Sequence, residues 1–346
     1  WPDAFIVREL SRRPSNFRSE KDMDTFLKEN GVPGITNIDT RELTMLLREH
    51  GTMNGMITTE EYTDLTHPIA RIKEYRVIGA VERASCKEKY IMSADEFVTT
   101  NYEEARLTYM ADQKMRQAIE NAKKAGVDLG RIAMYCVRGS EGIKKLNELA
   151  VDPKRVRKYR VAMMDFGTKK NMQHCLQKHG CEVTVYPAHT KAEEILSEGY
   201  DGIMLSNGPG DPAECTEIIE EIKKLCASDI PIFAICLGHQ LMALANGFRT
   251  KKMKYGHRGA NHPVREAATG RVYLSSQNHG YVVDGDSVDP AVAEIRFLNA
   301  NDGSVEGLTY REKKIFTVQF HPEACAGPAD TEFLFDEFVK LMEEDA

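Results

Sequence analysis

The sequence contains no apolar run that approaches the ~20 residues of a membrane-spanning helix, and no basic segment followed by an apolar one near its start. Its first residue is Trp1 rather than methionine, which suggests that the natural beginning is missing and that the N-terminal part is a remnant. We therefore expect a soluble, cytoplasmic protein that makes no membrane contact.

Cysteine pairs of the C-x-x-C type are also absent, although the chain has 8 cysteines. Their spacing disfavours zinc ribbons and a dense disulfide framework, so we expect no bound metal and mostly reduced thiols.

An excess of positive charge is missing as well. The 46 lysine and arginine residues face 53 aspartate and glutamate residues, and the net charge of -7 excludes a general nucleic-acid binder.

What is present is an ordinary globular composition, 42% apolar and 29% charged, in 346 residues, which is enough for two domains. Residues 1–90 read as mixed α and β. Asp39 is a candidate N-cap with Glu42 three residues on, and Gly51 ends an amphipathic pattern, which predicts a helix over 40–50. The segment 52–57 is strand-like.

Residues 91–158 have a different character and read as a charged helical insertion or linker. The stretch 103–126 is predicted to be helical, and a basic, proline-marked connector follows it. The basic run 154–160 is interpreted as a solvated face of this linker, in preference to a phosphate or nucleic-acid site.

From residue 159 to 346, apolar strands alternate with amphipathic helices. This repetition predicts a doubly wound, mostly parallel sheet covered by helices on both sides, an α/β fold. Sites in such folds lie at the carboxyl ends of the strands, where the turns "SNGPGDP" (206–212) and "CLGHQ" (236–240) fall. The fold class is therefore α/β, preceded by a truncated α+β domain.

"AICLG" has the small-x-nucleophile-x-small spacing of a nucleophile elbow. Small residues at Ala234 and Gly238 let the turn close, so that Cys236 projects from the sheet edge. The backbone N–H of Leu237 would then stabilise an oxyanion, and the N-terminus of the following helix favours a thiolate. The alternative is a buried small residue in a β-α turn, and this pattern alone does not decide between the two.

A cysteine nucleophile needs a base, and the base needs an orienting group. "FTVQFHPEA" offers His321 and Glu323, which would face the same side if the strand continued through them. His279 is a rival base, but it has no acidic residue two positions away and is the weaker candidate.

Two further segments carry polar or backbone groups suited to a substrate. Gly208 and Gly210 flank a proline in a turn that could present N–H groups to a carbonyl oxygen, although an ordinary β-α turn would have the same sequence. In "SSQNHGYVVD", Asn278, Gly280 and Tyr281 could hold a polar molecule.

Together, "CLGHQ", "SNGPGDP", "SQNHG" and "QFHPEA" resemble the motifs of class I, triad-type glutamine amidotransferases, over residues 161–346. The segments "VRELSRRPSNFRSE", "GVPGITNIDTRELTMLLREHGTMNGMI" and "DFGTKKNMQHCLQKHGCEVTVYP" are similar to those of a narrower family. That family is the small, glutamine-hydrolysing subunits of carbamoyl-phosphate synthetase.

The resemblance implies that Cys236 attacks the glutamine carboxamide to form a glutamyl thioester and ammonia. His321 would be base and then acid, oriented by Glu323, and His239 would have a supporting role. Backbone N–H groups of Gly210 and Leu237 would form the oxyanion hole. The residues implied to line the glutamine pocket are Gly208, Gln240, Asn278, Gly280 and Tyr281.

In this family, ammonia passes through a tunnel to a large subunit that makes carbamoyl phosphate from bicarbonate and ATP. The resemblance therefore implies a large-subunit partner that holds ATP and Mg, with no cofactor bound by this chain. The absence of a G-x-x-x-x-G-K-[ST] loop agrees with this division.

Three departures from the family pattern stand out. Ala234 replaces the usual glycine, the portion before Trp1 that contributes a serine to the glutamine site is missing, and the insertion at 91–158 is longer than usual. Two alternatives remain open at this point: the glutaminase component of another synthetase, of the anthranilate or GMP type, and a catalytically silent scaffold. Intact Cys236, His321 and Glu323 disfavour the scaffold.

Overall fold

The computed structural model describes residues 3–15, 19–92, 113–125, 159–325 and 327–343, with a few isolated positions between 127 and 147. The chain divides into two compact units, Trp1–Val77 and Ile78–Ala346, which are described separately. The division comes before the expected boundary at residue 90. The backbone N–H of Cys86 donates to the carboxylate of Asp165, which ties the segment after Val77 to the second unit.

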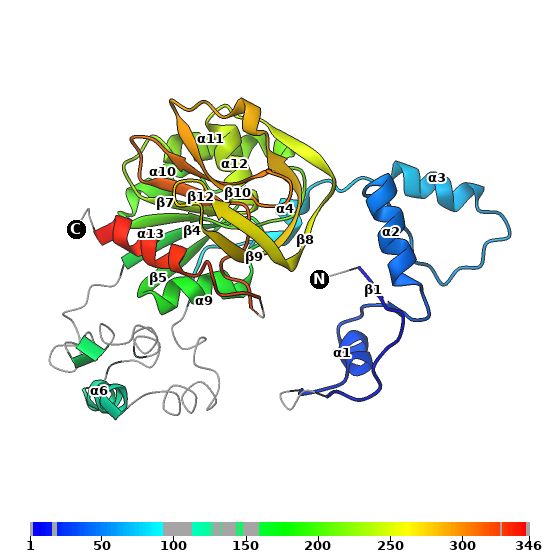
Figure 1. Ribbon diagram of the computed structural model, residues 1–346, viewed down its shortest axis with the longest axis horizontal. Coiled ribbons are helices and arrows are strands. Elements are labelled where there is room, and N and C mark those ends of the chain that lie inside the picture. Colours follow the sequence, from blue (N-terminus) through cyan, green and yellow to red (C-terminus); the bar gives the residue numbers. More distant parts are fainter. Residues whose placement is uncertain are drawn as a thin grey trace. The chain divides into compact units, whose positions relative to one another are not determined.

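The first unit contains short elements (Figure 1), and few apolar side chains in its described part are buried. The helix expected after Asp39 is confirmed, because the Asp39 carboxylate accepts from the N–H groups of Arg41 and Glu42 and Gly51 follows the helix at φ 90°. The strand expected at 52–57 is wrong: the unit's described sheet is the parallel pair β1–β2, and 52–57 pairs with neither strand. The elements are β1 (Phe5–Ile6), α1 (Met23–Glu29), β2 (Gly34–Ile35), α2 (Thr40–His50) and α3 (Thr66–Glu74).

The second unit is built on a ten-stranded sheet in the order β3-β5-β4-β6-β7-β12-β11-β10-β8-β9. The five strands from β5 to β12 are parallel, as expected. Their bounds are β5 (Cys181–Pro187), β4 (Tyr159–Asp165), β6 (Gly202–Leu205), β7 (Ile232–Ile235) and β12 (Ile315–Val318).

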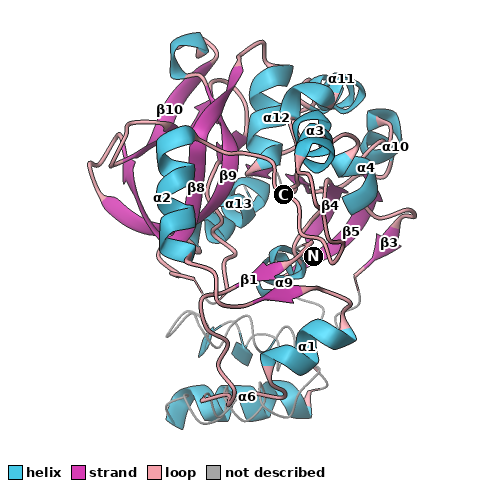
Figure 2. Cartoon of the chain, turned by 90° about the vertical axis from the view of Figure 1, so that its right-hand side faces the viewer, coloured by secondary structure: helices cyan, strands magenta, loops and turns pink. Residues whose placement is uncertain are grey.

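The remaining strands pair antiparallel, so the sheet is mixed and the expectation of a mostly parallel sheet holds only for its centre. Figure 2 shows β8, β9 and β10 side by side at one end. The antiparallel strands are β3 (Tyr90–Ile91), β8 (Thr250–Glu266), β9 (Val272–Val283), β10 (Ala293–Asn299) and β11 (Val305–Tyr310).

Helices cover both faces of the parallel strands, and the alternation of side chains along each strand serves both layers. On β4, Ala162 and Met164 join the cluster under α10, α11 and α12, whereas Val161 and Met163 join the cluster under α9 and α13. The two layers lie above and below the sheet in Figure 1. The α-helices in the described part of this unit are α4 (Ala80–Ala84), α6 (Gln113–Lys124), α9 (Lys170–Lys178), α10 (Ala192–Ser197), α11 (Thr216–Leu225), α12 (Leu237–Ala245) and α13 (Phe333–Glu343).

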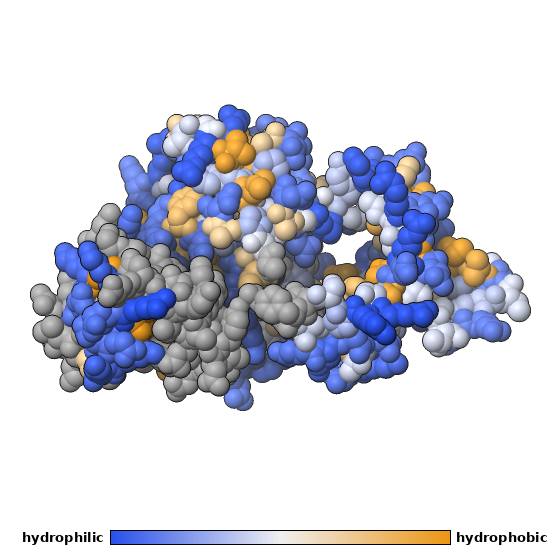
Figure 3. Space-filling model, turned by 60° about the horizontal axis from the view of Figure 1, so that its bottom comes forward, coloured by the Kyte–Doolittle hydropathy of each residue, from blue (hydrophilic) through white to orange (hydrophobic). Residues whose placement is uncertain are grey.

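The interpretation of 91–158 as a helical insertion is tested in part. Helix α6 lies within the predicted 103–126, while most other residues of the insertion, including the basic run up to 158, lie outside the described residues. No helix in the described part of the chain is long and apolar enough to cross a membrane. The face in Figure 3 is mostly hydrophilic, with small separate hydrophobic spots.

Candidate active site

Cys236 lies between the end of β7 and the start of α12, in the strand-turn-helix arrangement that the sequence predicts. Its backbone has φ 56° and ψ -104°, a conformation that costs a non-glycine residue energy and is typical of functional turns. The turn packs closely against the end of β6: a Cβ added to Gly238 would lie only 2.5 Å from the carbonyl oxygen of Leu205. Ala234, also small, is fully buried on β7.

His321 and Glu323 lie beyond the end of β12, in a turn rather than on the extended strand that we expected. The strand pairing ends at Val318, so the alternation of a strand does not bring the two side chains together. They meet through the turn instead, with His321 Nδ1 2.8 Å from Glu323 Oε1. Both side chains are buried.

The charges around His321 favour an imidazolium. Burial alone would lower its pKa, but the charge of Cys236, the charge of Glu323 and hydrogen bonds to both raise the pKa to about 9. Burial would in turn raise the pKa of Glu323, and the charge and hydrogen bond of His321 outweigh that effect and lower it. Because Nδ1 faces Glu323, Nε2 is the ring nitrogen that can exchange a proton with the Cys236 thiol.

Two residues that sequence reasoning did not assign to the site hold Glu323 in place. Lys169 Nζ lies 3.5 Å from Glu323 Oε1, and the side-chain amide of Asn171 donates to the Glu323 carbonyl. Both stand in the "DFGTKKN" segment, at the start of α9. The segment's likeness to the family was the only signal that pointed to it.

The glycine turn after β6 lies against the nucleophile turn. A Cβ on Gly208 would lie 2.3 Å from the Phe166 carbonyl oxygen and 2.7 Å from Leu237 Cδ2, so only glycine fits there. Gly210 has φ 102°. Leu237 is the first residue of α12, where backbone N–H groups have no partner from a preceding turn.

The other expected pocket residues lie on helix α12 and strand β9. Gln240 on α12 donates to the Tyr281 carbonyl at 2.9 Å and to Gln319 Oε1 at 2.8 Å, so its amide nitrogen is occupied within the protein. The Tyr281 hydroxyl hydrogen-bonds with Asp211 of the glycine turn; burial and this bond raise its pKa to about 12. Asn278 is exposed on β9, and Gly280 follows on the same face.

The two other histidines near the site are neutral. Burial lowers the pKa of His279 to about 3, and its ring nitrogens contact the Tyr281 carbonyl and Gln277 Oε1. Burial likewise lowers the pKa of His239 to about 3, and its Nδ1 lies 2.7 Å from the Thr317 hydroxyl. Neither is bonded to a carboxylate, in contrast to His321.

Comparisons with known proteins match this chain to two known protein families. The family "Glutamine amidotransferase class-I" matches residues 162–341, and "Carbamoyl-phosphate synthase small chain, CPSase domain" matches residues 1–57. Among solved structures, a putative GMP synthase component from Thermoplasma acidophilum covers 55% of this chain and 96% of that chain, with 20% identity and a TM-score of 0.49.

Curated relatives match almost the whole chain. The carbamoyl phosphate synthase small chain of Bacillus cereus is 38% identical over 341 residues, which are 99% of this chain and 76% of the relative. That of Clostridium perfringens is 40% identical over 337 residues, 97% of this chain and 77% of the relative. Because these matches include the first unit, they exclude the alternative that the chain is the glutaminase component of another synthetase. The chain belongs to the carbamoyl phosphate synthase small chain family and is a glutamine-hydrolysing amidotransferase subunit.

Proposed function

We propose that Cys236 hydrolyses glutamine with His321 as base and acid and Glu323 as the group that orients it. The observation that carries this assignment is the buried pair of His321 and Glu323, hydrogen-bonded to each other and, through His321, to the thiol at the end of β7. It has the geometry that a nucleophile, its base and an orienting acid require.

The proton transfers follow from this arrangement. His321 Nε2 holds the proton that the Cys236 thiol has given up, and the thiolate attacks the carboxamide carbon of glutamine. The N–H groups of Leu237 and Gly210 stabilise the oxyanion, and His321 returns the proton to the departing nitrogen as ammonia leaves. Neutral His321 then takes a proton from water, the hydroxide adds to the thioester carbon, and the C–S bond breaks to give glutamate and the Cys236 thiolate beside the protonated His321.

The glutamine substrate would lie between the glycine turn and β9. Gly208 allows close approach of the backbone, Gln240 offers its side-chain oxygen, and Asn278, Gly280 and Tyr281 line the β9 side. Because the amide of Gln240 is already held by Tyr281 and Gln319, its oxygen is fixed in direction before the substrate arrives.

The partner proposed for this chain is a large subunit that receives the ammonia and uses ATP, Mg and bicarbonate to build carbamoyl phosphate. The names of the relatives support the partnership, and we assign no cofactor to this chain. A cytoplasmic location fits the seven described cysteines, none of which is paired.

The test is Cys236→Ser in the chain assembled with its large subunit. We expect glutamine-dependent synthesis of carbamoyl phosphate to fall by at least about 10³-fold, because a hydroxyl is not activated as a thiol is, while synthesis from added ammonia persists. Parent and variant activities that are equal with glutamine would refute the assignment.

A further inference from the structure

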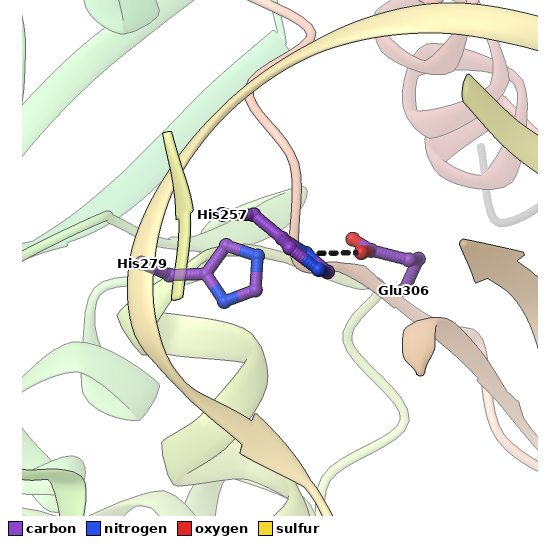
Figure 4. Close-up of side chains that lie close together, drawn as sticks. All are labelled: His257, His279 and Glu306. Carbon is purple, nitrogen blue, oxygen red and sulfur yellow. Dashed lines mark hydrogen bonds and ion pairs between the residues drawn. The ribbon is translucent and has the colours of Figure 1, made fainter. Parts of the chain in front are cut away.

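A second buried cluster of ionisable side chains lies outside the triad. His257 on β8, Glu306 on β11 and His279 on β9 are all buried and lie close together (Figure 4). The mechanism uses none of their protons, and burying charged groups costs energy unless they are paired. The proposed catalytic mechanism therefore does not explain why these three side chains are buried together.

His257 is held between two carboxylates. Its Nε2 lies 2.8 Å from Asp302 Oδ2 and its Nδ1 lies 3.2 Å from Glu306 Oε1. Burial alone would lower the pKa of His257, but hydrogen bonds to Glu306 and Asp302 and their charges raise it. The Asn299 amide also donates to Glu306 Oε1, at 3.1 Å.

Three residues of this kind could also ligate a metal ion. A metal needs an unprotonated ring nitrogen, however, and both nitrogens of His257 face carboxylate oxygens at hydrogen-bonding distance. An imidazolium that donates to both oxygens supplies the positive charge that the carboxylates need. His257 therefore joins the two carboxylates in one hydrogen-bond network, in which Glu306 Oε2 has no partner and burial raises the pKa of Glu306.

The network lies where the β8–β9 ladder is irregular. The register between these strands shifts between Lys252 and His257 and again between Gly259 and His262. Gly256 has φ 71°, and a Cβ there would lie 2.2 Å from the His279 carbonyl oxygen. Because the backbone pairing of β8 with β9 is interrupted here, side-chain contacts help to hold β9 in place.

From His257 the contacts continue to the proposed glutamine pocket. The rings of His257 and His279 are 5.0 Å apart and perpendicular. His279 Nδ1 lies 2.8 Å from the Tyr281 carbonyl oxygen, which also accepts from Gln240 behind the nucleophile. Two residues before Asn278, the Ser276 carbonyl accepts from the backbone N–H of His321.

We infer that His257 and Glu306 are positioning residues that hold residues 276–281 of β9 in the conformation that binds glutamine. This inference rests on the proposed function, since it assigns the same pocket. The two side chains act through His279 and the β9 backbone and touch no reacting atom.

The test measures glutamine hydrolysis by His257→Gln and Glu306→Gln, each assembled with the large subunit. We expect KM for glutamine to rise at least about tenfold while kcat stays within about threefold, because the nucleophile and base are unchanged. Asp302→Asn, which removes only the half-exposed outer partner, should raise KM by a smaller factor of about three and folds even if the buried variants do not.

The matched control is Glu266→Gln, also on β8. It breaks a partly buried pair in which Glu266 Oε1 lies 3.2 Å from a nitrogen of Arg296, remote from residues 276–281 in the ladder. We expect it to lower the melting temperature as the test variants do and to leave KM unchanged. An equal change of KM in all variants, or a KM that stays at the parental value, would overturn the inference.

Two further outcomes separate the inference from its alternatives. A stoichiometric metal ion in the purified parent that is lost in His257→Gln would replace the charged network by a metal site and overturn it. Failure of the proposed function shows differently, as a Cys236→Ser chain that hydrolyses glutamine at the parental rate.

Discussion

The ionisation of His321 depends on two neighbouring side chains, Cys236 and Glu323. Its pKa is raised to about 9 in the folded protein, so its pairing stabilises the fold fully below its ordinary pKa of 6.5, and that contribution is lost as the pH rises through about 9. Glu323→Gln removes one of the two charges that raise the pKa. We expect the loss of stability to move to lower pH, measured as melting temperature between about pH 6 and 10.

The same variant should lower kcat for glutamine hydrolysis by roughly 10²-fold or more, since a base without its orienting acid loses position and the stabilisation of its charge. Glu312→Gln, which changes an exposed carboxylate after β11, serves as the control and should match the parent in both measurements. A Glu323→Gln chain with the parental pH profile would contradict the role given to the pair.

The two candidate bases can be separated by their kinetic signatures. His321→Asn should suppress kcat strongly, by about 10³-fold, whereas His279→Asn should act mainly on KM, because His279 contacts the Tyr281 carbonyl and no carboxylate. Steady-state kinetics of both variants would decide, and the reverse pattern would make His279 the base.

Sequence patterns predicted that Cys236, His321 and Glu323 belong to one site, because the elbow and the H-P-E run are local, and the structure brings the three side chains together. Lys169 and Asn171 were not assigned to the site, since their contacts with Glu323 join segments more than 150 residues apart and exist only in the folded chain. The reason given for the meeting of His321 and Glu323 was also wrong, because whether a strand continues past Val318 depends on its partner strands.

At the scale of elements, the nucleophile turn depends on how closely α12 approaches β6. Gly238→Ala would place a Cβ 2.5 Å from the Leu205 carbonyl oxygen, so the start of the helix must shift. We expect a loss of stability of about 1–3 kcal/mol and a marked loss of kcat, checked by denaturant unfolding and glutaminase assay. Gly55→Ala, with open space around its Cβ, should change neither.

The elements themselves were predictable to different degrees. Asp39, Glu42 and Gly51 bounded α2 correctly because caps are read from neighbouring residues. The parallel strands followed from the β-α repeat. The antiparallel end of the sheet did not, because no helix separates β8 from β9 and their pairing is set by long-range contacts.

At the scale of the whole molecule, apolar burial is distributed unevenly between the two units. The three hydrophobic clusters of the described chain lie entirely in Ile78–Ala346. In the described part of Trp1–Val77, Leu27 and Val32 are the buried core side chains, and Met45 and Leu65 are each 60% exposed.

We therefore expect a fragment of residues 78–346 to unfold cooperatively on its own and a fragment of residues 1–77 to show no cooperative transition. Differential scanning calorimetry of the two fragments tests this. A sharp transition in the shorter fragment would mean that it is stabilised by something other than apolar burial.

The backbone angles of Cys236 also bear on how this protein tolerates mutation. Alanine normally stabilises a chain relative to glycine, by about 0.5–1 kcal/mol in regular structure, yet φ 56° and ψ -104° favour glycine over alanine. Among inactive variants, Cys236→Gly should therefore melt above Cys236→Ala. The backbone angles alone therefore favour glycine at the one position where the reaction requires a thiol.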